Sequence, residues 1–490
     1  MRPSRDSLSL RVGLGLASAA CVAIPFLAVS FPPCTDLPQH VAQVRLLLNV
    51  FSNPDSAYRI QWLTPYSLVY AVLGAAWAVV SPLQVGRVAL AGLAVSWTAA
   101  NHLLAARLRR PPESAVVASI LFFSPILYWG FLSFAMGWPV FVLWFLLTTR
   151  ESGSSGWKEA PGLLLGAVLL YVAHALWFAA GLSWLVLEGV VSQRPLRRIL
   201  IRLLAVSPVM MAAAIWYPKL AAAGFVSATV WQVSPIGHLS FSWLVNGAFG
   251  GLWGATEYAA FAAVAGWLWL GWRARAGSPL DGKLLAAGGM FFAFALLLPY
   301  EHMNTIEFAQ RWLPPALILT LLALPAPAFG PFLRYCASMA LVFTFCAATT
   351  VAWLRFDHSE LSGLREALAA VPQSPRLLGL DLVKDSRFVK KRPFLQIFAY
   401  AQVLRGGQIN FSFADFAPSL VVNRSREAHP WTVGLEWEPE HLKPRDLEYF
   451  DYALVNGTSA MHDRFREQFP VAPVTERGRW RLYRVTGGSS

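Results

Sequence analysis

Long apolar runs recur through the first 353 residues of the chain, and short polar stretches separate them. An α-helix needs about 20 consecutive apolar residues to cross a bilayer. The pattern therefore predicts an α-helical polytopic membrane domain over residues 1–353, with about eleven or twelve membrane segments. The runs lie near 12–31, 62–81, 83–104, 115–131, 134–149, 161–191, 199–217, 254–272, 284–299, 312–326 and 333–353.

The pattern changes after Trp353, where apolar residues alternate with charged ones. Residues 354–490 form a segment that is long enough to bury a hydrophobic core of its own. This segment is therefore predicted to be a separate α/β domain. Its periodicity predicts helices near 360–370, 393–404 and 460–468 and strands near 376–383, 449–455 and 480–485.

Basic residues predict the orientation of the chain in the membrane, because cytoplasmic loops carry an excess of Lys and Arg. Such residues gather near the N-terminus, at Arg334 and in the loops 107–110, 194–202 and 273–283. These parts are expected in the cytoplasm. The same rule places the remaining polar regions on the outer face, namely 32–61, 218–253, 300–311 and 354–490.

Two regions do not fit this topology if each apolar run is a single full membrane crossing. The run 161–191 must cross twice, as two short helices broken around 174–181. One of the two runs between 62 and 104 must be partial or re-entrant, because two full crossings would place the basic loop 107–110 outside. The first run resembles a signal peptide, but its length and the many runs after it favour a retained helix.

Composition agrees with a membrane protein and excludes several other classes. Hydrophobic residues make up 56% of the chain and charged residues 14%. The net charge of +13 lies in short loops, so it reflects orientation and does not predict a nucleic-acid partner. The sequence carries no phosphate-binding glycine loop, HExxH or GxSxG motif, which disfavours nucleotide-dependent and common hydrolytic chemistry.

The first candidate site follows the first apolar run. Asp36 lies between the pair Pro32-Pro33 and Pro38, and a predicted amphipathic helix begins directly after it. His40 follows Asp36 by four residues, a spacing that brings both side chains to one side of a helix. A catalytic role for Asp36 and His40 is the first interpretation. The alternative is that Asp36 only caps the helix.

The second candidate site lies before the run 312–326. It contains Glu301, His302, Glu307 and Arg311, the densest charged group between two predicted membrane segments on the outer side. Arg311 directly precedes that run, so its guanidinium is expected at the level of a lipid phosphate. Two alternatives stay open for Arg311: its side chain simply extends toward lipid headgroups, or it forms an i,i+4 ion pair with Glu307.

Two further histidines are candidate substrate-binding residues. His174 lies within an apolar run, where an ionisable group is a functional candidate, although a neutral imidazole bonded to the helix backbone is the alternative. His238 lies in the loop 218–253 among aromatic residues and glycines, a composition suited to sugars but also typical of interfacial loops.

This arrangement resembles the GT-C glycosyltransferase superfamily, which includes protein O-mannosyltransferases and the aminoarabinose transferases of lipid A. The resemblance rests on an Asp just past the first span, an Arg at the head of a late span and a terminal α/β domain. The segments 129–139 and 171–174 also resemble stretches of bacterial members. Asp36, His40 and Arg311 correspond to motif positions of the family.

The resemblance implies inverting transfer of a sugar from a polyprenyl-phosphate donor to a lipid, glycan or protein acceptor, in a bacterial inner membrane. Asp36 would act as the base and Arg311 would bind the departing phosphate. No cofactor is assigned, and a divalent metal stays an open alternative; many members carry paired acidic residues, whereas Leu37 follows Asp36 here. The rival functions are a lipid or polysaccharide transporter or flippase, and a non-catalytic scaffold subunit.

Overall fold

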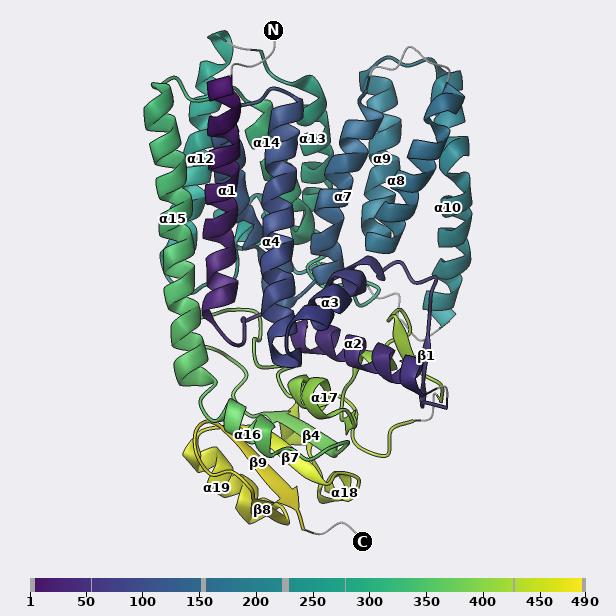
Figure 1. The fold of residues 1–490 in the computed structure, drawn as a ribbon, viewed down its shortest axis with the longest axis vertical. Coiled ribbons are helices and arrows are strands. Elements are labelled where there is room, and N and C mark those ends of the chain that lie inside the picture. Colours follow the sequence, from purple (N-terminus) through teal and green to yellow (C-terminus); the bar gives the residue numbers. More distant parts are fainter. Residues whose placement is uncertain are drawn as a thin grey trace.

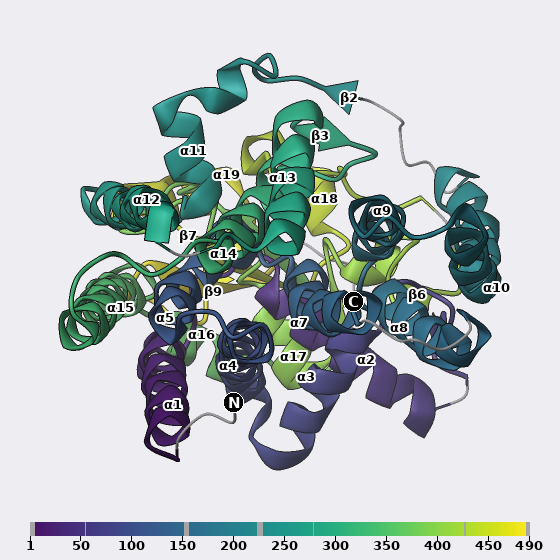
Figure 2. The same cartoon turned by 90° about the horizontal axis from the view of Figure 1, so that it is seen from above.

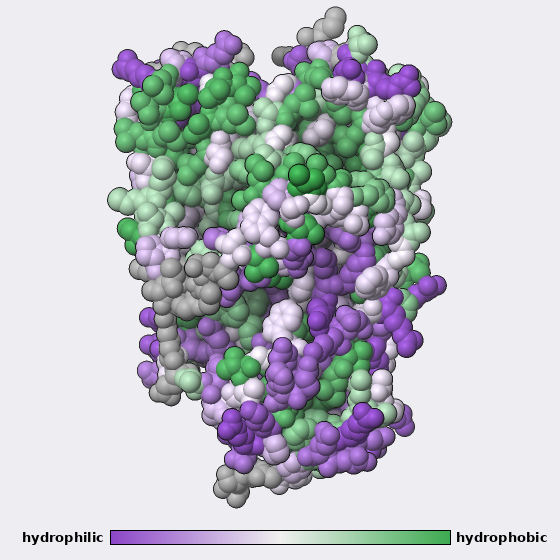
Figure 3. All heavy atoms as spheres, turned by 180° about the vertical axis from the view of Figure 1, so that it is seen from behind, coloured by the Kyte–Doolittle hydropathy of each residue, from purple (hydrophilic) through white to green (hydrophobic). Residues whose placement is uncertain are grey.

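The computed structural model of the chain describes residues 5–53, 55–150, 156–222, 229–277, 279–425 and 428–486. Upright helices form one large bundle, and a small α/β domain lies at one end of it (Figure 1). Figure 3 shows apolar residues gathered over the bundle, with hydrophilic residues at its far end and over the C-terminal domain. The chain is an integral membrane protein, as its hydropathy pattern predicts.

Long helices form the frame of the bundle. Among the described residues, 5 spans are long and apolar enough to cross a membrane, and they lie in α1 (Arg5–Ala28), α4 (Pro82–Arg107), α5–α6 (Pro112–Trp129), α10 (Leu196–Ala222) and α15 (Pro331–Arg355). Seen from above, shorter helices stand between them (Figure 2). These are α7 (Leu132–Thr148), α8 (Ala160–Ala173), α9 (Ala175–Val191), α12 (Thr256–Arg273), α13 (Gly282–Leu297) and α14 (Leu313–Ala323).

The conflict between 62 and 104 is resolved by a short helix. Helix α3 (Leu68–Val79) has 12 residues, and at about 1.5 Å per residue it is too short for a hydrocarbon core of about 30 Å. Helix α4 with 26 residues makes the crossing in this region. The expectation of one partial run is therefore confirmed.

The run 161–191 forms two helices, as predicted. The break is narrower than expected, since α8 ends at Ala173 and α9 begins at Ala175. His174 is extended between them, and its Nδ1 accepts a hydrogen bond of 3.1 Å from the Leu176 amide. His174 therefore caps α9.

The basic loops come together at the end of the bundle that lies away from the C-terminal domain (Figure 1). There Arg11 Nη1 donates to the Arg110 carbonyl at 3.1 Å, and Arg334 lies 2.7 Å from Glu113. Lys283 Nζ donates to the Thr149 carbonyl at 3.3 Å. One end of the molecule thus collects the positive charge, and a cytoplasmic location of that end stays a prediction.

The C-terminal domain contains a five-stranded sheet in the order β5-β4-β7-β9-β8. Strands β4 (Arg376–Asp381), β7 (Tyr452–Asn456) and β9 (Trp480–Val485) occupy the predicted positions. The short strands β5 (Gln408–Ile409) and β8 (Val471–Pro473) were not predicted, because two or three residues carry no readable alternation. Helices α16 (Leu364–Ala370), α17 (Ala399–Arg405), α18 (Pro444–Leu447) and α19 (Ser459–Gln468) accompany the sheet.

The helix predicted at 393–404 is shorter than expected. It begins at Ala399, and the residues before it form successive turns, with Leu395 donating to Arg392 O and Ile397 to Phe394 O. In this conformation the Gln396 side chain points toward α2 (Leu37–Ser52). Helix α2 lies across the end of the bundle (Figure 1), and it connects the two domains.

Backbone pairing also joins the outer loop 32–61 to the C-terminal domain. Strand β1 (Tyr58–Ile60) pairs antiparallel with β6 (Val421–Asn423). On α2, the Gln43 amide binds both backbone groups of Val421, with Nε2 donating to its carbonyl at 3.0 Å and Oε1 accepting from its amide at 2.8 Å. The second domain is therefore held directly over the loop that carries Asp36.

Candidate functional site

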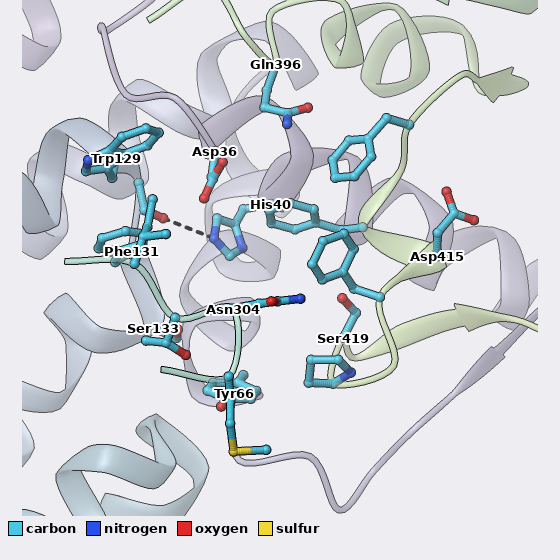
Figure 4. A pocket seen from close by; sticks show the side chains of 18 of the residues that line it. Asp36, His40, Tyr66, Trp129, Phe131, Ser133, Asn304, Gln396, Asp415 and Ser419 are labelled. Atoms are coloured by element: carbon cyan, nitrogen blue, oxygen red, sulfur yellow. Dashed lines mark hydrogen bonds between the residues drawn. The ribbon is translucent and has the colours of Figure 1, made fainter. Parts of the chain in front are cut away.

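A cavity of ≈ 830 Å³ lies where the helical bundle meets the C-terminal domain (Figure 4). Several parts of the chain line it, and three of them carry charged side chains. Asp36 and His40 come from the start of α2, a second wall comes from residues 301–311, and a third comes from residues 395–437 of the C-terminal domain. Residues that are far apart in the sequence therefore share one site.

Backbone contacts hold Asp36 in place. The Thr35 amide donates to the Tyr128 carbonyl at 2.9 Å, and the Asp36 amide donates to the Trp129 carbonyl at 3.1 Å. Gly130 has a φ of 86°, and a Cβ on it would come within 2.7 Å of the Asp36 nitrogen. This turn therefore requires glycine, which brings the chain close to Asp36.

The Asp36 carboxylate faces the cavity. Asp36 occupies the N-cap position of α2, but its side chain accepts no capping hydrogen bond, so capping alone does not explain the residue. Within the described ranges it forms no ion pair either. Burial raises the pKa of Asp36 to about 8, and the nearby charge of Arg311 opposes that shift. A carboxyl group with this pKa has the proton affinity of a general base near neutral pH.

His40 makes two hydrogen bonds through its ring. Nε2 lies 3.2 Å from the Gly130 carbonyl, which only accepts, so Nε2 carries the proton. Nδ1 then accepts from the Tyr70 hydroxyl at 3.0 Å. Burial lowers the pKa of His40 to about 4, which keeps the ring neutral. His40 therefore fixes the Gly130 turn against Asp36, and both ring nitrogens are occupied in this arrangement.

Arg311 lines the cavity and is only 5% exposed. Its Nε and Nη2 donate to the Ile306 carbonyl at 3.1 and 2.8 Å, and its guanidinium carbon lies 3.5 Å from the centre of the Phe131 ring. Nη1 has no partner among the described residues. Burial lowers the pKa of Arg311 to about 10, so the side chain stays charged at neutral pH. It offers a fixed cation with one free donor group.

The other predicted substrate-binding residues divide into two groups. Glu301, His302 and His174 line the cavity. Glu307 lies outside the lining and forms an ion pair with Lys391, so the alternative i,i+4 pair with Arg311 is not made. His238 also lies outside the lining, where Nδ1 donates to the Ala295 carbonyl at 3.0 Å.

The wall from the C-terminal domain was not predicted. Asp415 accepts from the Ser412 amide at 3.1 Å and lies 3.6 Å from His429. Burial raises the pKa of Glu436 to about 7. The only sequence signal was the aromatic stretch 411–416 around Asp415, which is ambiguous without its partners in space. The wall also includes Gln396, Asn410, Phe411, Phe413, Phe416, Trp431 and Trp437.

Over the described ranges, no group of three or more His, Cys, Asp and Glu side chains is placed to hold a metal ion. Asp36 and the carboxylates of the C-terminal wall act as separate groups in this arrangement.

No protein-family model matches the chain, and no curated protein matches it. Among solved structures, it resembles ArnT from Cupriavidus metallidurans bound to undecaprenyl phosphate, with a TM-score of 0.57 and 12% identity over 100% of both chains. It also resembles ArnT of that organism in the apo state, with a TM-score of 0.55 and 12% identity over 99% of both chains. ArnT is a GT-C polytopic membrane glycosyltransferase, so the predicted GT-C-like fold is confirmed.

Proposed function

We propose that this protein is a membrane glycosyltransferase that moves a sugar from a polyprenyl-phosphate donor to an acceptor on the outer face of the membrane. The observation that carries the proposal is the shared cavity of Asp36 and Arg311, a buried carboxyl group with a raised pKa and a buried cation with a free donor. The ArnT fold supports it, since one of those structures is described as bound to undecaprenyl phosphate.

The two residues divide the reaction between them. The acceptor oxygen forms a bond to the anomeric carbon while its proton passes to the Asp36 carboxylate. The bond from that carbon to the phosphate oxygen breaks, and its electron pair stays on the polyprenyl phosphate. Arg311 stabilises the negative charge that develops there. The sugar is transferred with inversion, and the free polyprenyl phosphate is the second product.

The polyprenyl tail would lie along the bundle side of the cavity. Apolar and aromatic side chains line the cavity there, including Tyr66, Trp216, Tyr217 and Leu176. Arg311 lies at the head of α14, at the end of the bundle where lipid phosphates would be. This arrangement fits a lipid whose headgroup enters the cavity and whose tail stays among helices.

The charges of the helical bundle favour an enzyme over a transporter with a polar pathway. Glu188 is paired with Arg202 at 2.7 Å, and Glu257 is paired with Lys390 at 2.8 Å. A pathway would require polar groups that can exchange partners along the membrane. In the part of the chain that the structure describes, these buried carboxylates are instead neutralised by fixed neighbours.

The test is turnover of defined donors in nanodiscs. Purified protein receives undecaprenyl-phosphate-linked glucose, galactose, mannose or N-acetylglucosamine with a membrane extract as the source of acceptor, and release of undecaprenyl phosphate is measured. Asp36→Asn should reduce release by about a hundredfold or more, because Asn keeps the shape but cannot accept the proton. The matched control is Asp55→Asn, at an exposed Asp in the same outer loop. Full turnover by Asp36→Asn would refute its role as the base.

A further inference from the structure

The side-chain amide of Gln39 on α2 has a defined orientation. Its Oε1 accepts from the Phe413 amide at 3.1 Å, and its Nε2 donates to the Phe411 carbonyl at 2.9 Å. A backbone amide can only donate and a backbone carbonyl can only accept. These two bonds therefore fix which end of the Gln39 side chain is nitrogen.

The orientation of Gln39 determines that of Gln396 in the C-terminal domain. Gln39 Nε2 also donates to Gln396 Oε1 at 2.9 Å, so Gln396 presents oxygen to α2 and its Nε2 points away. Gln396 is 2% exposed and lines the cavity. Gln39 lies one turn after Asp36, so this bond places Gln396 at the Asp36 end of the cavity (Figure 4).

Gln396 Nε2 is a cavity-side donor without a protein partner. It makes no hydrogen bond to any described residue. A polar group inside a protein that has no protein partner is usually bound by water or by a ligand. An oxygen atom of a substrate would satisfy this amide.

Glu436 supplies a matching acceptor on the same wall. It is 7% exposed and lines the cavity, and its carboxylate accepts no hydrogen bond from another described residue. Asp415 lines the same wall. Arg311 belongs to the wall on the bundle side, whereas Glu436 and Asp415 belong to the wall on the domain side. A phosphate therefore fits the Arg311 side and is disfavoured on the Glu436 side.

The mixture of groups on the domain side fits a sugar ring. Hydroxyl groups both donate and accept, so they can bind an amide donor and a carboxylate acceptor together. The apolar face of a ring packs against aromatic side chains, and Phe411, Phe413 and Trp437 line this part of the cavity. A lipid tail at this place would leave Gln396 Nε2 and the Glu436 carboxylate without hydrogen-bond partners.

We propose that the C-terminal domain forms the subsite for the sugar ring of the donor, with Gln396 Nε2 donating to one hydroxyl and Glu436 accepting from another. This inference rests on the proposed function. It assigns to the C-terminal domain the choice of sugar, while Arg311 binds the phosphate that every donor shares. Gln396 and Glu436 are specificity-determining residues in this arrangement.

The test compares the carrier lipid alone with the same lipid carrying a sugar. Binding of undecaprenyl phosphate and of four undecaprenyl-phosphate-linked sugars (glucose, galactose, mannose and N-acetylglucosamine) is measured to the full chain in nanodiscs. Gln396→Glu keeps an oxygen for Gln39 and replaces only the donor that faces the cavity. It should weaken the tightest sugar-linked ligand about tenfold and leave undecaprenyl phosphate within about twofold, because one buried hydrogen bond is lost.

A second variant keeps the test decisive if Gln396→Glu does not fold. Glu436→Leu should weaken the same sugar-linked ligand about tenfold without affecting undecaprenyl phosphate. The matched control is Glu438→Leu, at a side chain that is 56% exposed and outside the cavity lining. It should change neither affinity.

Each remaining outcome counts against the inference. The subsite is refuted if no sugar-linked ligand binds wild type more tightly than undecaprenyl phosphate, or if the variants weaken both ligands equally. Failure of wild type to bind undecaprenyl phosphate itself would instead overturn the proposed function, and this inference with it.

Discussion

At the scale of single residues, Asp36 and Arg311 are placed by backbone contacts that leave functional atoms free. Asp36 is held through its amide, and Arg311 is held through two of its three nitrogens. The His40 ring supports the turn beside them. Asp36 and Arg311 therefore each have a fixed position and an unused polar atom that faces the cavity.

The raised pKa of Asp36 predicts a pH dependence of activity. Below pH 8 the carboxyl group is mostly protonated, since burial raises its pKa to about 8, and it cannot accept a proton. Turnover should therefore rise with pH up to about 8 and level off above it. The pH profile of release of undecaprenyl phosphate measures this. A profile that is flat from about pH 6 to about pH 9 would contradict the role of Asp36 as the base.

The same shift predicts a pH dependence of stability. The pKa of Asp36 rises from 3.8 in the unfolded chain to about 8 in the folded protein, so folding favours the protonated form. That stabilisation is complete below the unfolded pKa and is lost as the pH rises through the folded pKa. Asp36→Asn should lack this loss and gain thermal stability relative to wild type as the pH is raised. Equal pH dependence in both proteins would argue against a buried, protonated Asp36.

Arg311→Lys should weaken binding of undecaprenyl phosphate by about tenfold or more. Lysine keeps the charge, but it cannot donate to the Ile306 carbonyl with two nitrogens and present a third to phosphate. Arg59→Lys, at an exposed position of β1, is the control and should bind as wild type does. Unchanged affinity in Arg311→Lys would remove Arg311 from the phosphate site.

At the scale of elements, the segment 386–392 fastens the C-terminal domain to the helical bundle. Lys390 Nζ donates to Glu257 Oε2 at 2.8 Å, and Glu257 Oε1 accepts from the Leu252 amide at 2.6 Å. The next residue, Lys391, forms an ion pair with Glu307. Its carbonyl accepts from Thr35 Oγ1 at 2.6 Å, directly before Asp36. This segment therefore contacts residues next to Asp36 and the loop that carries Arg311.

Lys390→Met should destabilise the protein by about 3–5 kcal/mol, because it leaves the Glu257 carboxylate buried without a cation. Thermal unfolding in detergent measures the loss. The double variant Lys390→Met/Glu257→Gln should recover a large part of it, since the buried charge is then gone. If the single variant unfolds at the wild-type temperature, the ion pair does not hold the two domains together.

The sequence predicted elements well where the signal is local. The apolar runs located the bundle helices, and alternation located β4, β7 and β9. The site was predicted in part, because Asp36 and Arg311 lie beside membrane segments that make charged residues conspicuous. Gln396 and Glu436 could not be predicted, since their roles depend on Gln39 and on a cavity formed by segments more than 300 residues apart.

At the scale of the whole molecule, the two ends differ in charge and in structure. The basic loops gather at one end of the bundle, and the cavity with the C-terminal domain lies at the other (Figure 1). By the positive-inside rule we expect the basic end in the cytoplasm. The cavity would then open on the outer face, which is the face where the proposed transfer takes place.

This orientation is tested by cysteine labelling in a Cys336→Ala background, because Cys336 is exposed on α15. A membrane-impermeant maleimide should label Glu438→Cys in sealed, right-side-out spheroplasts, since that residue lies in the C-terminal domain. Arg197→Cys, in the first turn of α10 at the other end, should react only after the membrane is disrupted. The reverse pattern would place the cavity in the cytoplasm and refute the topology.

The central claim is that Arg311 binds the phosphate of a polyprenyl carrier in the cavity that also contains Asp36. A density map of the wild-type protein in nanodiscs with undecaprenyl phosphate tests it most directly. The account predicts phosphate density within hydrogen-bond distance of Arg311 Nη1, with the polyprenyl tail extending past Tyr66 and Trp216 into the bundle. Phosphate density at another site, or a cavity without density under saturating lipid, would contradict the account.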